Sequence, residues 1–171
     1  MKLKQLTTDA LLTAIALTIF MIEAQIPAPI PIPGIKLGLA NIITVFAIFA
    51  FTPKDAFLIL FVRVFMGSIF SGQISTLLYS AAGGFLCFVA MFLLRNVLTT
   101  NQLWVASVIG AVCHNIGQII VAILVTGTPS IAIYLPVLMV SGIAAGLFTG
   151  LCTQYLFKKL VANKVIKRHP Q

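Results

Sequence analysis

The chain has 171 residues, of which 60% are hydrophobic and 8% are charged, and its net charge is +8. Soluble domains carry roughly 25% charged residues, so this composition excludes an ordinary soluble domain. It predicts an all-α integral membrane protein, a single transmembrane domain over residues 1–171, with room for about six membrane-spanning helices.

Glycine, proline and charged residues divide the apolar sequence into segments that we expect to be helices. In chain order they cover residues 8–25, 37–51, 54–70, 75–95, 101–125 and 130–157, followed by a basic tail over residues 158–171. The second and third segments are short for a full crossing, which predicts a tilted or protein-lined path.

The first helix and the loop after it carry distinct local signals. Thr7 or Thr8 is expected to be the N-cap of the first helix, which places Asp9 in its first turn, where the helix dipole favours negative charge. The next stretch, QIPAPIPIPGIKLGLANI, holds four prolines and begins at Gln25. Because proline fixes φ and lacks a backbone donor, this stretch predicts a stiff, non-helical loop.

The basic residues predict the orientation. Six crossings put both termini on one side of the membrane, and nine of the eleven Lys and Arg residues fall on that side. Lys36 falls on the opposite side, and Arg63 lies inside a predicted span. By the positive-inside rule the termini are cytoplasmic. The positive charge therefore reflects topology and contact with the lipid bilayer, and nucleic acid is not an expected partner.

Polar side chains inside the predicted helices are the candidate site residues, because an ionisable group at the bilayer centre costs at least ~2.5–3.5 kcal/mol on insertion scales. At ~1.5 Å per residue, Arg63 and His114 fall near mid-membrane, whereas Glu23 and Asn41 fall in the outer half. In the stretch CHNIGQ, Gln118 follows His114 by four residues and shares its helix face. The predicted substrate-binding residues are Glu23, Asn41, Arg63, His114, Asn115 and Gln118.

Two interpretations of these polar residues remain open. In the first, Glu23 forms a structural ion pair with Arg63 or Lys36, and the amides form hydrogen bonds between helices. In the second, the side chains converge from four helices on a ligand pocket that opens to the outside, which is the interpretation we favour. On the first helix, Ala10 and Ala14 share a face near the cytoplasmic surface and are suited to close docking of a partner helix.

At this point a family resemblance is evident. The chain length, the Ala10–Ala14 pattern and the external loop running into PGIKLGLANI resemble the substrate-binding S-components of energy-coupling factor (ECF) transporters. More narrowly, PGIKLGLANI, RVFMGSIFSG and HNIGQ resemble the Gx transporter family, whose members are also labelled heptaprenyl diphosphate synthase component I. The resemblance covers about Thr8 to Phe157.

The resemblance implies a multi-pass protein of a bacterial cell membrane that binds a small molecule between the outer halves of its helices. The proline loop would be a lid or wall of the site. Ala10 and Ala14 would face a transmembrane coupling subunit driven by two ATPases. We therefore expect the substrate-binding subunit of an importer for an anionic or ring-containing metabolite.

An alternative is a non-catalytic membrane partner in prenyl diphosphate or quinone metabolism, or in membrane electron transfer. A related possibility is a scaffold that recruits a soluble enzyme through its tail, Lys158 to Gln171. Prenyl transfer itself requires Mg²⁺ held by clustered carboxylates, whereas the chain has only three acidic residues, none near another in sequence. A glycine-lysine phosphate loop is also lacking. We predict no enzyme activity, no metal site and no cofactor.

Overall fold

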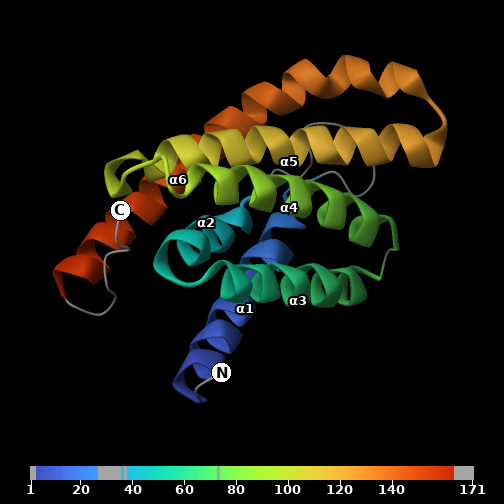
Figure 1. Cartoon of the computed structure of the whole chain (residues 1–171). Helices are drawn as coiled ribbons and strands as arrows, with labels where there is room; N and C mark the ends of the chain where they lie inside the picture. Colours follow the sequence, from blue (N-terminus) through green and yellow to red (C-terminus); the bar gives the residue numbers. More distant parts are fainter. Residues whose placement is uncertain (1–2, 27–35, 37, 73, 164–171) are drawn as a thin grey trace.

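The computed structural model describes residues 3–26, 36, 38–72 and 74–163, and this part of the chain is all-helical (Figure 1). A helix was predicted at each of the six places where the structure has an α-helix. The helices are α1 (Leu3–Glu23), α2 (Asn41–Ala50), α3 (Pro53–Ser71), α4 (Ile74–Leu94), α5 (Leu103–Thr126) and α6 (Leu135–Ala162), with 3-10 helices η1 (Thr100–Gln102) and η2 (Pro129–Tyr134) before α5 and α6.

Four helical segments of the described chain are long and apolar enough to cross a membrane: Leu3–Glu23, Ile74–Leu94, Thr100–Thr126 and Pro129–Ala162. The α2 helix has 10 residues, which is shorter than the ~17 that a crossing needs. The predicted all-α class is thus confirmed, together with four helices that could span a membrane. Six crossings and cytoplasmic termini stay predictions.

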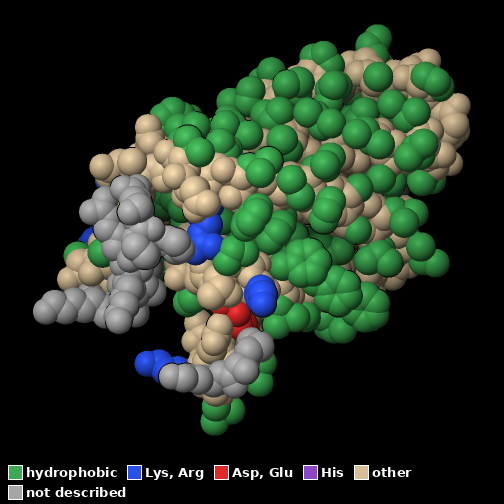
Figure 2. Space-filling view, in the orientation of Figure 1, with side chains coloured by type: hydrophobic (Ala, Val, Ile, Leu, Met, Phe, Trp, Pro, Cys, Tyr) green, Lys and Arg blue, Asp and Glu red, His purple; other side chains and the backbone are tan. Residues whose placement is uncertain are grey.

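The helices form an elongated bundle. Figure 1 shows α3, α4 and α5 running lengthwise side by side, α6 folding back over α5, and α1 crossing the others obliquely. The α3–α4 and α5–α6 connections lie at one end, whereas α1 begins and α6 ends toward the other. Hydrophobic side chains cover much of the visible surface, and the visible charged atoms lie on the side of the molecule where α1 begins and α6 ends (Figure 2).

Glycines let the helices α4, α5 and α6 approach one another closely. A Cβ added at Gly117 would lie 2.8 Å from the carbonyl oxygen of Ala82, and one added at Gly150 would lie 2.5 Å from the Cα of Trp104. Both neighbours are backbone atoms, so no side-chain rotation can make room. This is the small-residue packing by which membrane helices associate without a hydrophobic driving force between them.

The short α2 helix lies in the interior of the bundle. Seven of its ten residues are buried, and all but Asn41 and Thr44 are apolar, as expected of a helix enclosed by others. Val45 and Ile48 of α2 pack with Ile59 of α3, Met91 of α4 and Phe157 of α6 in the main hydrophobic core. The core thus fixes α2 relative to helices on several sides.

Two sequence predictions about helix ends are wrong. The α1 helix begins at Leu3, so Thr7 and Thr8 lie inside it, where their hydroxyls donate to the carbonyls of Leu3 and Lys4 at 3.0 Å. Neither is an N-cap, and the first turn contains no acidic residue, so Asp9 is not there. The basic tail was placed from residue 158, yet α6 continues to Ala162.

The α3 helix begins at Pro53, one residue before the predicted start at residue 54. The Thr52 hydroxyl accepts a hydrogen bond from the backbone N–H of Asp55, the Asp55 carboxylate accepts one from the backbone N–H of Thr52, and Pro53 occupies the first turn. This capping box assigns Asp55 a structural role. The four prolines of the predicted loop and residues 164–171 of the tail lie outside the described residues.

Candidate functional site

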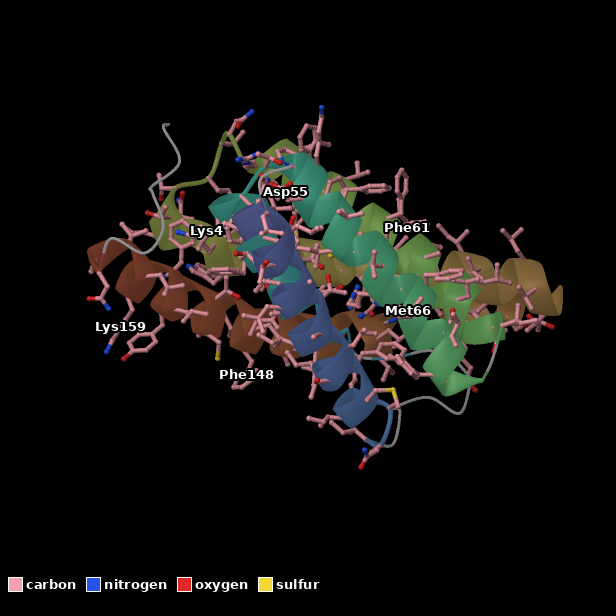
Figure 3. The ribbon with its side chains drawn as sticks, turned by 90° about the horizontal axis from the view of Figure 1, so that it is seen from below. Lys4, Asp55, Phe61, Met66, Phe148 and Lys159 are labelled. Atoms are coloured by element: carbon pink, nitrogen blue, oxygen red, sulfur yellow. The ribbon has the colours of Figure 1, made fainter. Side chains whose placement is uncertain are left out.

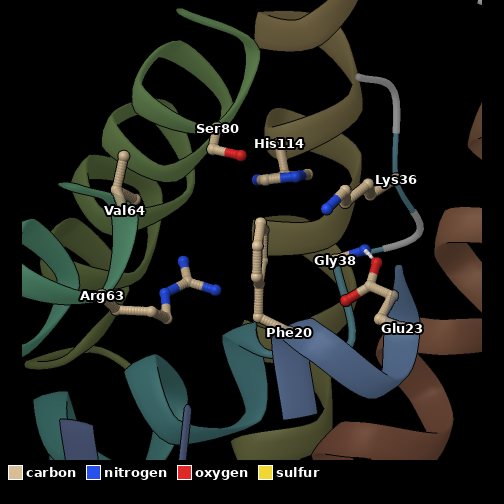
Figure 4. Close-up of a pocket in the computed structure, with 8 residues that line it drawn as sticks. All are labelled: Phe20, Glu23, Lys36, Gly38, Arg63, Val64, Ser80 and His114. Atoms are coloured by element: carbon tan, nitrogen blue, oxygen red, sulfur yellow. Dashed lines mark hydrogen bonds between the residues drawn. The ribbon is translucent and has the colours of Figure 1, made fainter. Parts of the chain in front are cut away.

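A small, partly open cavity with polar and apolar lining residues lies between α1, α3, α4, α5 and the residues leading into α2 (Figure 4). Its volume is about 10 Å³, which is roughly what one water molecule needs. The side chains of the site therefore fill almost all of its space. The lining residues are Phe20, Glu23, Lys36, Gly38, Arg63, Val64, Ser80 and His114.

Arg63 is the buried cation of this cavity. It is 5% exposed, and its Nη2 donates to the Oδ1 of Asn41 at 3.1 Å. The Nε of Arg63 and the Nδ2 of Asn41 are buried donors without a hydrogen-bond partner within the described part of the chain. In Figure 4 the ring of Phe20 stands between the guanidinium of Arg63 and the carboxylate of Glu23. Unpartnered donors beside a cavity can donate hydrogen bonds to an anionic ligand.

Glu23 binds backbone rather than a cation. Its Oε1 accepts from the N–H of Gly38 at 2.5 Å, and its Oε2 accepts from the N–H of Ala40 at 3.3 Å. Gly38 has φ +82°, which glycine adopts without the strain that a side chain would bring. Because Ala40 immediately precedes α2, the carboxylate holds the N-terminus of that helix, where negative charge is favourable. Glu23 thus anchors the start of α2.

Lys36 lies on the opposite wall from Arg63. Its Nζ lies 3.6 Å from the centroid of the Phe20 ring, in a cation–π contact. Burial lowers the pKa of Lys36, while the Glu23 carboxylate acts in the opposite direction. With its amide oriented to suit its neighbours, Gln118 donates to the carbonyl of Lys36 at 3.1 Å and accepts from its N–H at 3.2 Å. Gln118 therefore positions Lys36.

His114 lies against α4 and fills one side of the cavity. A Cβ added at Gly83 would lie 2.8 Å from the Cε1 of the imidazole, so glycine is what leaves the ring its space. In the orientation that satisfies Gln118, the Nε2 of His114 lies 3.2 Å from the oxygen of that amide. The imidazole is thus held between two helices and linked to the wall that carries Lys36.

The side chain of Asn115 points away from the cavity, toward α6. Its Nδ2 donates to the carbonyl of Leu138 on α6, and it is not among the residues that line the cavity. Of the six predicted site residues, Glu23, Arg63 and His114 line the cavity. Asn41 and Gln118 hold residues that line it. The structure brings these five together and leaves Asn115 in the contact between α5 and α6.

The other lining residues were harder to predict from the sequence. Phe20 precedes Glu23 by three residues on α1, which places the two side chains on one face of the helix. Phe20 and Val64 are apolar, however, and burying an apolar side chain is ordinary in a membrane protein. Only a polar residue such as Ser80 carries a signal that can be read from sequence.

The face of α1 that carries Ala10 and Ala14 is exposed. The buried residues of this helix lie on the other face and include Asp9, Thr13 and Phe20. The alanines therefore do not take part in packing within the described chain. In the part of the chain that the structure describes, no group of three or more His, Cys, Asp or Glu side chains is placed to hold a metal ion.

Comparison with known proteins gives one match. A protein-family model described as heptaprenyl diphosphate synthase component I matches residues 12–156, which include all of the cavity-lining residues. No curated protein and no solved structure matches the chain.

Proposed function

Because the chain belongs to the heptaprenyl diphosphate synthase component I family, we propose that it is a membrane-embedded, non-catalytic subunit that binds an anionic or ring-containing metabolite for import. The family description names a component, which supports a role within a larger assembly. The finer role rests on the chemistry of the cavity.

The single observation that supports this function is the state of Arg63. A buried arginine in an apolar environment is costly unless it is paired. Its hydrogen bond in the described chain goes to the neutral amide of Asn41, and its Nε has no partner there. Glu23, the acid that could have neutralised it, binds backbone instead. An anionic group of a ligand would complete the site.

The cavity also suits a ligand with a flat or apolar part. Phe20 presents a ring between Arg63 and Lys36, and Val64 adds an aliphatic surface. A guanidinium is matched to the two oxygens of a carboxylate or phosphate. Since the cavity has room for about one water, binding requires the side chains of Lys36 and Phe20 to move aside. The ammonium would then exchange its contact with the Phe20 ring for one with the anion.

Native mass spectrometry of the gently purified protein tests the proposal. We expect a co-purifying anionic metabolite, and we expect Arg63→Gln to lose it. Asn115→Ala is the matched control, because Asn115 lies on a neighbouring buried position but faces α6, and it should keep the metabolite. The proposal fails if the parent protein carries no metabolite and no member of a panel of small anions raises its melting temperature.

We further propose that Ala10 and Ala14 form the docking face for a transmembrane coupling subunit with two ATPases. Their exposure on α1 supports this, because small exposed residues let a partner backbone approach closely. Replacing both with Leu should abolish co-purification of the coupling subunit and ATP-dependent uptake while ligand binding stays normal. Ala144→Leu, at an exposed position of α6, is the control that should change neither.

The family description favours a second function: a non-catalytic membrane partner in prenyl diphosphate or quinone metabolism, or in membrane electron transfer. Such a scaffold could recruit a soluble enzyme through the basic tail. Deleting residues 163–171 separates the two functions. A scaffold should lose its soluble partner, whereas an importer subunit should keep its bound metabolite.

A further inference from the structure

A second hollow lies on the outside of the bundle, in the seam between α3 and α4. It has a volume of about 180 Å³ and is lined by Phe57, Leu60, Phe61 and Val64 of α3 and by Ala81 and Phe85 of α4. We call it the α3–α4 groove. All of its lining side chains are apolar, so it offers nothing to a polar ligand.

The groove has a closed floor and an open rim. Leu60 is 4% exposed and Val64 is 9% exposed, whereas Phe61 and Phe85 are 59% and 55% exposed. Figure 3 shows Phe61 on the side of α3 away from α1, where no helix of the described chain covers it. The groove therefore faces the surroundings of the bundle, which for a membrane protein are lipid.

The same seam separates the groove from the polar cavity. Val64 lines both hollows. On α3, Arg63 lines the cavity, next to Val64. On α4, Ser80 lines the cavity and its neighbour Ala81 lines the groove. A cationic site and an apolar groove thus meet across one layer of side chains.

The direction of the groove follows from its residues. Val64 marks the end beside the cavity, and Phe57 lies two turns closer to the start of α3, about 10 Å away at ~1.5 Å per residue. Phe57 and Phe61 stack with their ring centroids 6.5 Å apart, which stiffens the rim. The groove is a preformed apolar channel leading away from Arg63.

We propose that the ligand is a single-chain amphiphile, whose anionic head enters the polar cavity and whose hydrocarbon chain lies in the α3–α4 groove. This inference rests on the proposed function and names its substrate class. The charges of Arg63 and Lys36 select the head, and the apolar groove selects the chain. A bilayer lipid that merely fills the groove would not require the groove and the cavity to adjoin at Val64.

Equilibrium binding of two probes to the protein in lipid nanodiscs tests the inference. The probes are dodecyl phosphate, with its concentration expressed per lipid, and inorganic phosphate. Ala81→Trp fills the groove from an exposed position and should be tolerated by the fold. It should weaken dodecyl phosphate binding by about tenfold or more, which corresponds to about 1.4 kcal/mol, and leave inorganic phosphate binding unchanged.

Ala144→Trp is the matched control, because it places the same side chain on the exposed face of α6. It should change the binding of neither probe, and Arg63→Gln should remove both. If Ala81→Trp weakens both probes, a folding defect is indicated, and Phe85→Ala, which removes an exposed wall of the groove and does not line the cavity, then decides by the same criterion.

Three results would overturn the inference. Unchanged dodecyl phosphate binding in Ala81→Trp and in Phe85→Ala would mean that the chain leaves the cavity elsewhere, while the proposed function would stand. Equal weakening by Ala144→Trp would mean that the chain adsorbs to any lipid-facing surface. Absence of binding of both probes to the parent protein would reject a phosphate-bearing amphiphile as the ligand, and the proposed function would then be decided by native mass spectrometry and the panel of anions.

Discussion

The role of Glu23 gives the sharpest prediction about stability. Glu23→Ala removes the acceptor of two hydrogen bonds, from the N–H groups of Gly38 and Ala40, at the start of α2. A hydrogen bond to a charged group contributes about 1.5–3 kcal/mol, and the 3.3 Å bond to Ala40 is long enough to be the weaker one. Together they predict a loss of about 2–4 kcal/mol in the free energy of unfolding.

Glu23→Gln is the graded comparison. Its side-chain oxygen can still accept one of the two hydrogen bonds, but the charge is lost and the amide nitrogen cannot accept the other. We therefore expect about half the loss seen with Glu23→Ala. Thermal unfolding of the three purified proteins in the same detergent measures both effects.

The same variants separate an anchor from a ligand-binding residue. Removing a negative charge beside an anion site cannot weaken anion binding electrostatically, so Glu23→Gln should bind inorganic phosphate at least as well as the parent. If Glu23→Ala is as stable as the parent, the anchoring role is wrong. If Glu23→Gln instead keeps its stability but loses phosphate binding, Glu23 contacts the ligand.

Three further predictions concern neighbouring contacts. Gly117→Ala places a Cβ 2.8 Å from the carbonyl oxygen of Ala82. Overpacking lowers the free energy of unfolding by ~1–3 kcal/mol, whereas the higher helix propensity of alanine raises it by ~1 kcal/mol. The melting temperature of the variant should therefore fall. Asn115→Ala loses the bond to Leu138 and should cost about 1 kcal/mol, with phosphate affinity unchanged; a fall in affinity would place Asn115 in the site. Because burial lowers the pKa of Lys36, its ammonium group deprotonates at a lower pH than that of free lysine. The affinity for phosphate should fall as the pH rises through that range. Lys36→Arg should remove that alkaline limb, whereas a flat profile in the parent would contradict it.

Much of the fold could be predicted because its signals are local. Long apolar runs bounded by glycine, proline and charge gave a helix at each of the six places where the structure has one. The start of α1 was placed too late because threonine is a favoured N-cap residue, so Thr7 or Thr8 was taken as the cap. Their hydroxyls instead bond back to carbonyls of the preceding turn, which threonine does readily inside a helix.

The candidate site could be predicted in part because buried polar groups are rare in an apolar chain. The cost of burying Arg63 and His114 singled them out from sequence alone. Asn115 follows His114 directly, and consecutive helical residues point about 100° apart, so the two cannot share a face. That Glu23 would bind backbone rather than Arg63 depends on where α2 begins in space. No pattern within α1 carries that information.

The contrast between the walls of the cavity indicates where it can open. Along α4 and α5 the backbones touch at Gly117, and no side chain can move aside to widen that contact. On the other side, closure depends on the Lys36 side chain, which rests on the ring of Phe20. A cation–π contact contributes about 0.5–2 kcal/mol and can be exchanged for a contact with an anion, whereas a backbone contact at glycine offers no side chain that can move aside. A ligand that brings its own negative charge would compete directly for Lys36, so the anion that fits the site is also the agent best able to open it.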